Sequence, residues 1–388
     1  MGSSAPARPS VLAIFRRHGE AYLAGRPWLS PEQRRLLRDV MVCRTAALGG
    51  HVYVCDSCEH RLPVYNSCRN RSCPNCQALD QARWIEARKA RVLPVGHHHV
   101  VFTLPGQLRA LAKRHPRKVF DLLMTSVRET LTVLPRDHLG LQLGVTAVLH
   151  TWTREMLFHP HVHCVVTAGG LSLDGARWVD RKGFLLPVAL MKAFFRGRVL
   201  HHLGRLQDLG ELELQPAAYK KLIGSLPKPK RWCIHIEQPF GRSAHVLDYL
   251  GRYTHRIAIS DFRLVDVNDD SVRFRTRGDE TTALSPEVFI DRYLQHVLPR
   301  GLHKIRHFGL YAAANVHKRL PVAQSLLAEV DRDHEAEPGP EPVAETAVEL
   351  LLRLTGEDLL RCPKCQTGRM AQRPLPINGA RGPPSWTS

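Results

Sequence analysis

Apolar residues recur every three or four positions over much of the chain, a pattern that predicts amphipathic helices. The first such helix covers 10–25. A second begins at Ser30-Pro31-Glu32-Gln33, where Ser30 can cap the helix and Gln33 can complete a capping box. Further helices are expected at 77–92, at 107–134 with an interruption at Pro116, and at 187–206, 243–255 and 286–297.

Short apolar runs that end at turn residues predict β-strands. The most apolar of them, HHHVVFTL at 97–104, is stopped by Pro105-Gly106. Gly169-Gly170 turns the chain after another. The expected strands are 97–104, 143–152, 160–168, 231–237, 256–266 and a hairpin of 270–276 with 281–284.

The length of 388 residues allows two or three domains. We expect a helical and metal-binding domain at 1–95 and a catalytic domain at 96–330. The remaining residues, 331–388, contain the acidic, proline-rich stretch 335–342, which reads as a linker. The polar end of the chain, from Arg369 on, is expected to be disordered.

The charge balance points to a polyanionic partner. Lys and Arg number 55 against 36 Asp and Glu, which gives a net charge of +19. Nucleic acid is the first candidate and an anionic membrane the second. No apolar stretch reaches the roughly 18–20 residues that cross a bilayer, and Met1–Ser10 contains no signal-peptide core. We therefore expect a cytoplasmic protein without membrane association, located at the nucleoid when it is bound to DNA.

Cysteine spacing predicts bound metal. Ten cysteines in a reducing compartment are poor candidates for disulfides, and six of them form C-x-x-C pairs. Two pairs separated by fourteen residues match a four-cysteine zinc ribbon, in which each pair directs two thiolates at one Zn²⁺. The expected structural zinc ligands are Cys55, Cys58, Cys73 and Cys76.

Three further ligands, Cys43, His51 and Cys68, could belong to a second site. Arg69 and Arg71, on the loops of the predicted ribbon, are candidates for contacts with DNA phosphates. The pair Cys362 and Cys365 is half a ribbon. It would form a loose knuckle or take its other ligands from elsewhere in the chain.

Histidine spacing predicts a second kind of metal site. In the expected strand HPHVHCVVT, His161 and His163 lie two positions apart and therefore share one face. Two imidazoles held in this way can chelate a divalent ion and leave positions open for chemistry. The residues leave the third ligand open between Glu155, His99 and His159.

Two tyrosines are candidates for nucleophiles. Tyr249 and Tyr253 are four positions apart in an expected helix, so both hydroxyls lie on one face. The same spacing also fits an ordinary apolar stripe, and by itself it favours a core position. The neighbouring Arg252 and Arg256 are cations that could assist a phenolate or contact DNA.

These motifs, in this order, resemble a known family. FTLP, then His-hydrophobic-His, then Tyr-x3-Tyr resembles the HUH single-strand DNA endonucleases. The cysteine cluster ahead of them is similar to that of the two-tyrosine rolling-circle transposases, the insertion sequence 91 family. The matching segments are CRTAALGGH (43–51), YNSCRNRSCPNCQ (65–77), HVVFTLP (99–105), HPHVHCVVTAGG (159–170), YLGRYTHRIAIS (249–260) and LQHVLPRGLHKIRHFGLYA (294–312).

The chain departs from the family pattern at two positions. Ser72 stands where the family often has histidine, which weakens the expectation of a second zinc site. Arg154 stands where the family often has glutamine, so no metal ligand is carried over to that position.

The resemblance implies an α+β fold. An antiparallel-sheet endonuclease domain would carry flanking helices on one face and the His-hydrophobic-His strand in its middle, preceded by a small helical zinc-ribbon domain. It also implies a transposase that nicks and rejoins single-stranded DNA at transposon ends and target through 5′-phosphotyrosine intermediates, with Mg²⁺ or Mn²⁺ for catalysis and Zn²⁺ for structure. The alternatives are a rolling-circle replication initiator, a non-catalytic zinc-ribbon nucleic-acid-binding protein, and a zinc hydrolase.

Overall fold

The computed structural model describes residues 9–181, 183, 186–237, 251, 257–331, 346–356 and 358–374. The predicted helix at 243–255 therefore lies outside the described residues except for Gly251, and so does the acidic linker at 335–342. Among the described helices, none combines the length and the apolar character that crossing a bilayer requires.

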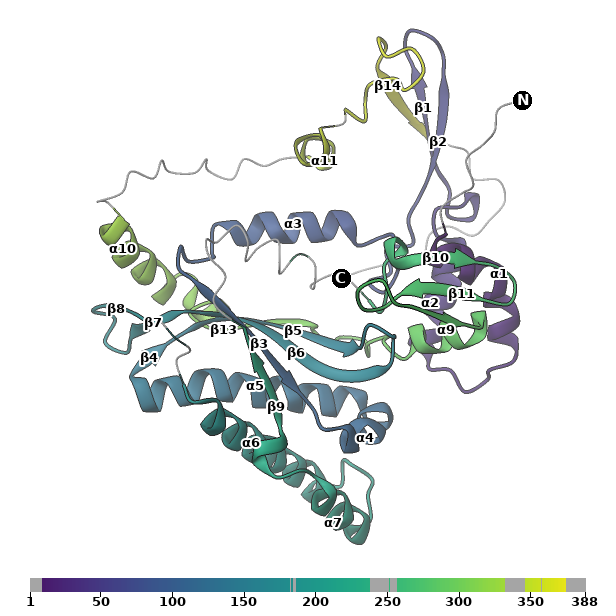
Figure 1. The fold of residues 1–388 in the computed structure, drawn as a ribbon. Coiled ribbons are helices and arrows are strands. Elements are labelled where there is room, and N and C mark those ends of the chain that lie inside the picture. The colour runs from purple at the N-terminus through teal and green to yellow at the C-terminus, as the bar shows by residue number, and fades with distance from the viewer. Residues whose placement is uncertain are drawn as a thin grey trace.

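A five-stranded antiparallel sheet forms the centre of the molecule (Figure 1). The strand that carries His161 and His163, β6, is the third of the five, as predicted. The sheet order is β13 (Ile305–Gly309), β5 (Gly144–Trp152), β6 (Phe158–Thr167), β3 (His97–Thr103) and β9 (Cys233–Ile236).

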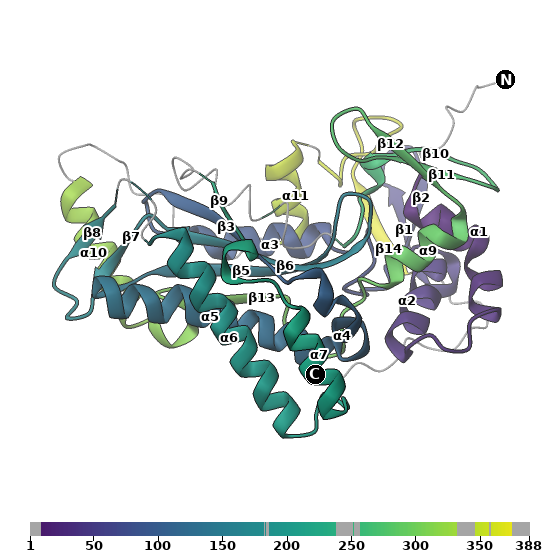
Figure 2. The same ribbon diagram turned by 60° about the horizontal axis from the view of Figure 1, so that its bottom comes forward.

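The two faces of this sheet differ because side chains alternate along each strand. One face is apolar and packs against α5 (Pro116–Leu139) and α6 (Val188–Asp208), which come forward in Figure 2. Phe102 of β3, for example, meets Phe195 of α6 edge to face, with ring centroids 5.0 Å apart. Short helices α4 (Arg109–Arg114) and α7 (Pro216–Ser225) extend this layer.

The other face carries the histidines and is covered by the basic helix α3 (Ala78–Lys89). Trp84 of α3 packs with Val148 of β5, Val165 of β6 and Ile305 of β13. The expected packing of helices on one face holds for α5 and α6, and α3, from the predicted domain 1–95, covers the other face. A sheet with polar side chains on one face can still carry a helix there when two or three apolar residues provide the contact.

The N-terminal helices pack against a segment far along the chain. α1 (Val11–Ala24) and α2 (Pro31–Val42) share a buried cluster with α9 (Pro286–Leu294) and with the three-stranded sheet β10 (Leu264–Val267), β11 (Val272–Arg275) and β12 (Thr281–Leu284). The capping box at Ser30 and Gln33 is present, as predicted. The predicted strand 256–266 is shorter than expected: in this region only Leu264–Val267 pairs in a sheet.

A strand near the C-terminus pairs with a strand of the N-terminal region. β14 (Met370–Pro374) pairs antiparallel with β1 (Gly50–Cys55), whose other neighbour is β2 (Arg61–Tyr65). The prediction of disorder from Arg369 onward is thus wrong for 370–374. A polar strand forms there because a partner edge, distant in sequence, supplies its hydrogen bonds.

Several elements carry weak sequence signals. Gly169-Gly170, expected to be a turn, belongs to strand β7 (Gly169–Ser172), which pairs with β4 (Leu141–Gln142) and β8 (Trp178–Asp180). Two helices that the sequence analysis did not predict are α10 (Arg319–Asp331) and α11 (Ala347–Thr355).

Candidate functional site

Three imidazoles converge on the face of the central sheet that α3 crosses. His161 and His163 project from β6, and His150 projects from β5 directly opposite His161. The three offer ligand nitrogens that all lie within 4.8 Å of one another. Their ring centroids are 4.5 Å apart for His150 and His163 and 4.8 Å apart for His161 and His163. Three rigid nitrogen donors on neighbouring strands form one face of a metal coordination sphere and leave the opposite face open.

The protonation of His161 suits this role. Its Nδ1 lies 2.6 Å from the carbonyl oxygen of His159. A carbonyl only accepts, so Nδ1 carries the proton and Nε2 keeps its lone pair. Burial, partly offset by this hydrogen bond, lowers the pKa of His161 to about 4, and the imidazole is neutral at pH 7.

A hydrogen-bonded chain sets the tautomer of His163. Nδ1 of His99 lies 2.9 Å from Oε2 of Glu237, and Nε2 of His99 lies 2.8 Å from Nδ1 of His163. The carboxylate accepts from His99 Nδ1–H. Burial lowers the pKa of His99 and keeps it neutral, so its bare Nε2 accepts from His163 Nδ1–H. Nε2 of His163 is then the unprotonated ring nitrogen, which is the form that can bind a metal.

None of the three expected third ligands joins the group found among the described residues. His99 supports His163 instead. His159 bonds through Nδ1 to the guanidinium of Arg109, 3.0 Å away. Glu155 sits in the β5–β6 turn, where a hydrogen bond with Thr153 lowers its pKa. The residue missed was His150. The signal for it is the pairing of the predicted strands 143–152 and 160–168, which as a hairpin place His150 opposite His161.

A buried lysine lies beside the triad. Nζ of Lys304, just before β13, is 5.0 Å from the ring centroid of Trp152, and that ring stacks on His150 with centroids 4.5 Å apart. Burial, and to a lesser degree the charge of Arg71, lower the pKa of Lys304 to about 7. The Lys304 charge in turn contributes to the lowered pKa of His163. The site thus has a cation close to its metal ligands.

The cysteines form two groups, and neither is the predicted one. Cys73 and Cys76 join Cys43 and Cys68, whereas Cys55 and Cys58 face Cys362 and Cys365. His51 joins neither group of described residues. Spacing suggested that adjacent C-x-x-C pairs share an ion. The β1–β2 hairpin instead carries the first pair away from the second, and each pair finds a partner elsewhere.

The first cysteine group fits zinc. A tetrahedral site with Zn–S bonds of about 2.3 Å has sulfur–sulfur edges of about 3.8 Å. The observed Sγ–Sγ distances are 3.4 Å for Cys43 and Cys76, 3.6 Å for Cys68 and Cys76, and 3.8 Å for Cys43 and Cys73. Ser72 is buried beside this group, which already has four cysteine ligands without it.

The two predicted arginines differ in their surroundings. Arg71 donates to the carbonyl oxygens of Leu298, Pro299 and Leu302 at 2.6–2.9 Å. These bonds join the cysteine loop, residues 68–76, to the segment between α9 and β13. Arg69 is exposed and lines a cleft of about 480 Å³ together with Arg35, Arg71 and Arg300. This basic cleft fits a phosphate backbone.

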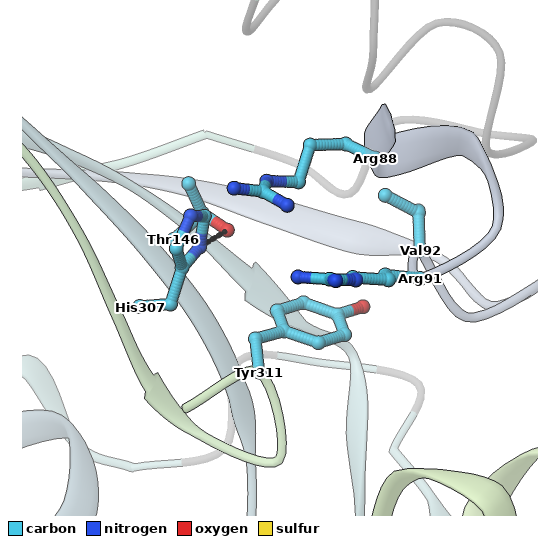
Figure 3. Close-up of a pocket in the computed structure, with 6 residues that line it drawn as sticks. All are labelled: Arg88, Arg91, Val92, Thr146, His307 and Tyr311. Atoms are coloured by element: carbon cyan, nitrogen blue, oxygen red, sulfur yellow. Dashed lines mark hydrogen bonds between the residues drawn. The ribbon is translucent and has the colours of Figure 1, made fainter. Parts of the chain in front are cut away.

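A second basic pocket lies on the histidine-bearing face of the sheet. Figure 3 shows the guanidinium groups of Arg88 and Arg91 pointing into one space above the ring of Tyr311 and beside His307. Thr146, which lines it, is four residues from His150 on β5, so both side chains are on the same sheet face. Its described lining contains no carboxylate. Burial, with the charges of Arg88 and Arg91, lowers the pKa of His307 to about 4.

Tyr249, Tyr253, Arg252 and Arg256 lie outside the described residues. Gly251, between the two tyrosines, is described and buried. Its carbonyl oxygen accepts a hydrogen bond from the side chain of Gln81 on α3. A Cβ added to Gly251 would lie 2.6 Å from Cδ1 of Ile85, so an alanine there would require the Ile85 side chain on α3 to shift.

Comparison with known proteins identifies the family. Residues 144–319 match the Y2_Tnp family, described as "Putative transposase", and residues 14–104 match the transposase zinc-binding domain of the IS91 family. The chain is 42% identical over 97% of both chains to "Putative transposase y4qJ" of Sinorhizobium fredii. It is 29% identical to the transposase for insertion sequence element IS801 of Pseudomonas savastanoi pv. phaseolicola, over 83% of this chain and 81% of that one. No solved structure matches. A histidine-bearing antiparallel sheet, a zinc-binding segment and full-length similarity to such proteins agree: the chain belongs to the IS91 family of transposases.

Proposed function

We propose that this transposase cleaves and rejoins single-stranded DNA with Tyr249 and Tyr253 as nucleophiles and a divalent metal at the histidine triad. The observation that carries the proposal is the convergence of His150, His161 and His163 on one sheet face, with supporting hydrogen bonds to His161 and His163 already in place. A sheet that needed only burial would not place three imidazoles there.

The other tyrosines are poor nucleophiles, which supports the choice of Tyr249 and Tyr253. The hydroxyl of Tyr293 donates to the carbonyl oxygen of Ser72 in the core, and that of Tyr311 lies 2.9 Å from Nε2 of His97. Burial raises the pKa of both. Raised pKa values also mark Tyr22 and Tyr219, and the remaining described tyrosines, Tyr53 and Tyr65, belong to the ribbon strands β1 and β2.

The position of Gly251 supports a nucleophile near the triad. It contacts Gln81 and Ile85 of α3, the helix that crosses the histidine face of the sheet. Tyr249 and Tyr253 are each two residues from this contact. A segment anchored there can present a phenol to a phosphate bound over the histidines.

In the proposed reaction a tyrosine phenolate oxygen attacks a DNA phosphorus atom. A P–O bond to the tyrosine forms, the bond to the 3′ oxygen breaks, and that oxygen leaves as a 3′-hydroxyl after taking up a proton. The second tyrosine would serve a second strand transfer. Because one phosphodiester replaces another of similar energy, no nucleotide hydrolysis is needed.

The residues present fit a catalytic divalent ion. A bound Mg²⁺ or Mn²⁺ would act as a Lewis acid on the scissile phosphate. The ligands would be His150 and the Nε2 atoms of His161 and His163, and three nitrogen donors favour Mn²⁺ over Mg²⁺. Lys304 adds a cation near the charge that builds up on the phosphate.

The basic pockets suggest how a strand is held. Arg88 and Arg91 lie along the same sheet face as the triad, and the cleft that Arg69 lines lies between α2 and the cysteine loop. We propose that both contact phosphates of single-stranded transposon ends or target. The rolling-circle pathway follows from the two-tyrosine chemistry, because each tyrosine can hold one 5′ end while the free 3′-hydroxyl is used.

The test is covalent capture of single-stranded DNA. The purified full chain is incubated with labelled single-stranded element ends and Mn²⁺, and adducts are resolved on a denaturing gel. We expect an adduct that is lost in the double variant Tyr249→Phe/Tyr253→Phe and kept in the control Tyr65→Phe. Cleavage without any adduct would favour the zinc hydrolase reading. An adduct that persists in the double variant would place the nucleophile elsewhere.

A further inference from the structure

Four cysteines from the N-terminal and C-terminal parts of the chain lie together. Cys55 is the last residue of strand β1 and Cys58 lies just after it, whereas Cys362 and Cys365 precede strand β14, which pairs with β1 (Figure 1). The pairs are separated by about three hundred residues, so their spacing in the sequence gives no indication that they belong together.

The geometry of this group is that of a closed tetrahedral thiolate site. Sγ of Cys55 is 3.7 Å from Sγ of Cys365, and Sγ of Cys58 is 3.7 Å from Sγ of Cys362. These distances match the edge of about 3.8 Å expected around Zn²⁺ with four sulfur ligands. Cys55 and Cys362 are buried.

Backbone N–H groups point at the sulfurs from both pairs. The N–H groups of Ser57 and Cys58 donate to Sγ of Cys55 at 3.4 Å, and the N–H of Gly368 donates to Sγ of Cys365 at 3.3 Å. Such bonds favour the thiolate, which is the form that binds metal. Gly368 also allows the close approach, since a Cβ there would lie 2.7 Å from Cβ of Ser57.

We propose that Cys55, Cys58, Cys362 and Cys365 bind one Zn²⁺ that clamps the C-terminal segment to the N-terminal ribbon. This ion is separate from the one at Cys43, Cys68, Cys73 and Cys76, so the chain binds two. The matched zinc-binding domain ends at residue 104 and does not include the C-terminal ligands.

A zinc ion at these four cysteines would restrain residues 358–374. Before this segment, Arg353 of α11 forms an ion pair of 3.3 Å with Glu86 of α3. A partly exposed ion pair contributes little to stability, and among the described strands β14 pairs with the edge strand β1 alone. The zinc is therefore the principal restraint on 358–374, and its removal should release that segment while the central sheet remains folded.

The first measurement is zinc stoichiometry in the full chain, by elemental analysis after dialysis against metal-free buffer. We expect two zinc ions per chain in the wild type and one in Cys362→Ser/Cys365→Ser. The control Cys233→Ser, an exposed cysteine outside both groups, should keep two. One zinc in the wild type, or two in the C-terminal double variant, would overturn the proposal.

Two further measurements keep the test decisive if the double variant is poorly folded. Cys365→His retains a four-ligand zinc set and should keep two zinc ions. In the wild type, alkylation followed by mass spectrometry should show Cys55, Cys58, Cys362 and Cys365 becoming reactive together as chelator is added. Reactivity of Cys362 and Cys365 that is unaffected by zinc would refute the clamp.

Discussion

The support of His163 by Glu237 and His99 can be tested quantitatively. Glu237→Gln keeps an oxygen that can accept from His99 Nδ1–H but removes the charge. Groups that orient metal-ligating histidines typically account for a factor of about 10–100 in metal affinity. The Glu237 side chain is 45% exposed, so we expect the lower value, a roughly tenfold loss or about 1.4 kcal/mol.

His99→Phe is the stronger perturbation. The imidazoles of His99 and His163 lie edge to edge, joined by the 2.8 Å hydrogen bond, and a phenyl ring at position 99 removes both hydrogen bonds of this residue. Nδ1–H of His163 then loses its acceptor in a half-buried place, and the imidazole is no longer held with Nε2 toward the cluster. We expect a loss of metal affinity near the upper limit of this range, about 100-fold or 2.7 kcal/mol.

The assay is calorimetric titration of the zinc-loaded full chain with Mn²⁺. His235→Gln is the matched control, because His235 lies 3.6 Å from the other oxygen of Glu237 but has no bond to His163 among those found. It should bind Mn²⁺ like the wild type. Wild-type affinity in His99→Phe, or an equal loss in His235→Gln, would refute the role of this hydrogen-bonded chain.

Three other changes test the site. Lys304→Met should raise the free energy of unfolding in urea by an amount on the order of 4 kcal/mol at pH 7 and below. Between about pH 7 and 10.5 the unfolded lysine binds a proton that the folded one does not, so the wild type gains stability as the pH rises. The difference in unfolding free energy between the variant and the wild type should therefore shrink over this range. A difference in unfolding free energy that is as large at pH 9.5 as at pH 7 would contradict the lowered pKa of Lys304. Gly251→Ala should lower adduct formation by overpacking on α3, and Ile85→Val, which removes the obstructing methyl group, should restore it. Arg88→Ala/Arg91→Ala should reduce the slope of log affinity for single-stranded DNA against log salt by about 1.4, at about 0.7 per phosphate contact, in filter binding, and an unchanged slope would remove this pocket from the DNA path.

Local patterns in the sequence are sufficient for most elements. The capping box at Ser30, the break before α5 at Pro116 and the strands β3, β5 and β6 all follow from the residues themselves. The α+β fold and the central place of β6, which the family resemblance implied, are also confirmed. Helix and strand periods, caps and turns act over a few residues, and a single sequence contains that information.

Which distant residues meet was decided only by the tertiary structure. His150 joins the triad because the β5–β6 register sets it opposite His161, and Cys362 and Cys365 meet Cys55 and Cys58 because β14 pairs with β1. A C-x-x-C or His-x-His motif determines that two ligands point the same way. The remaining ligands depend on which strands pair, and that choice is made by burial and hydrogen bonding summed over the whole chain rather than by any one segment.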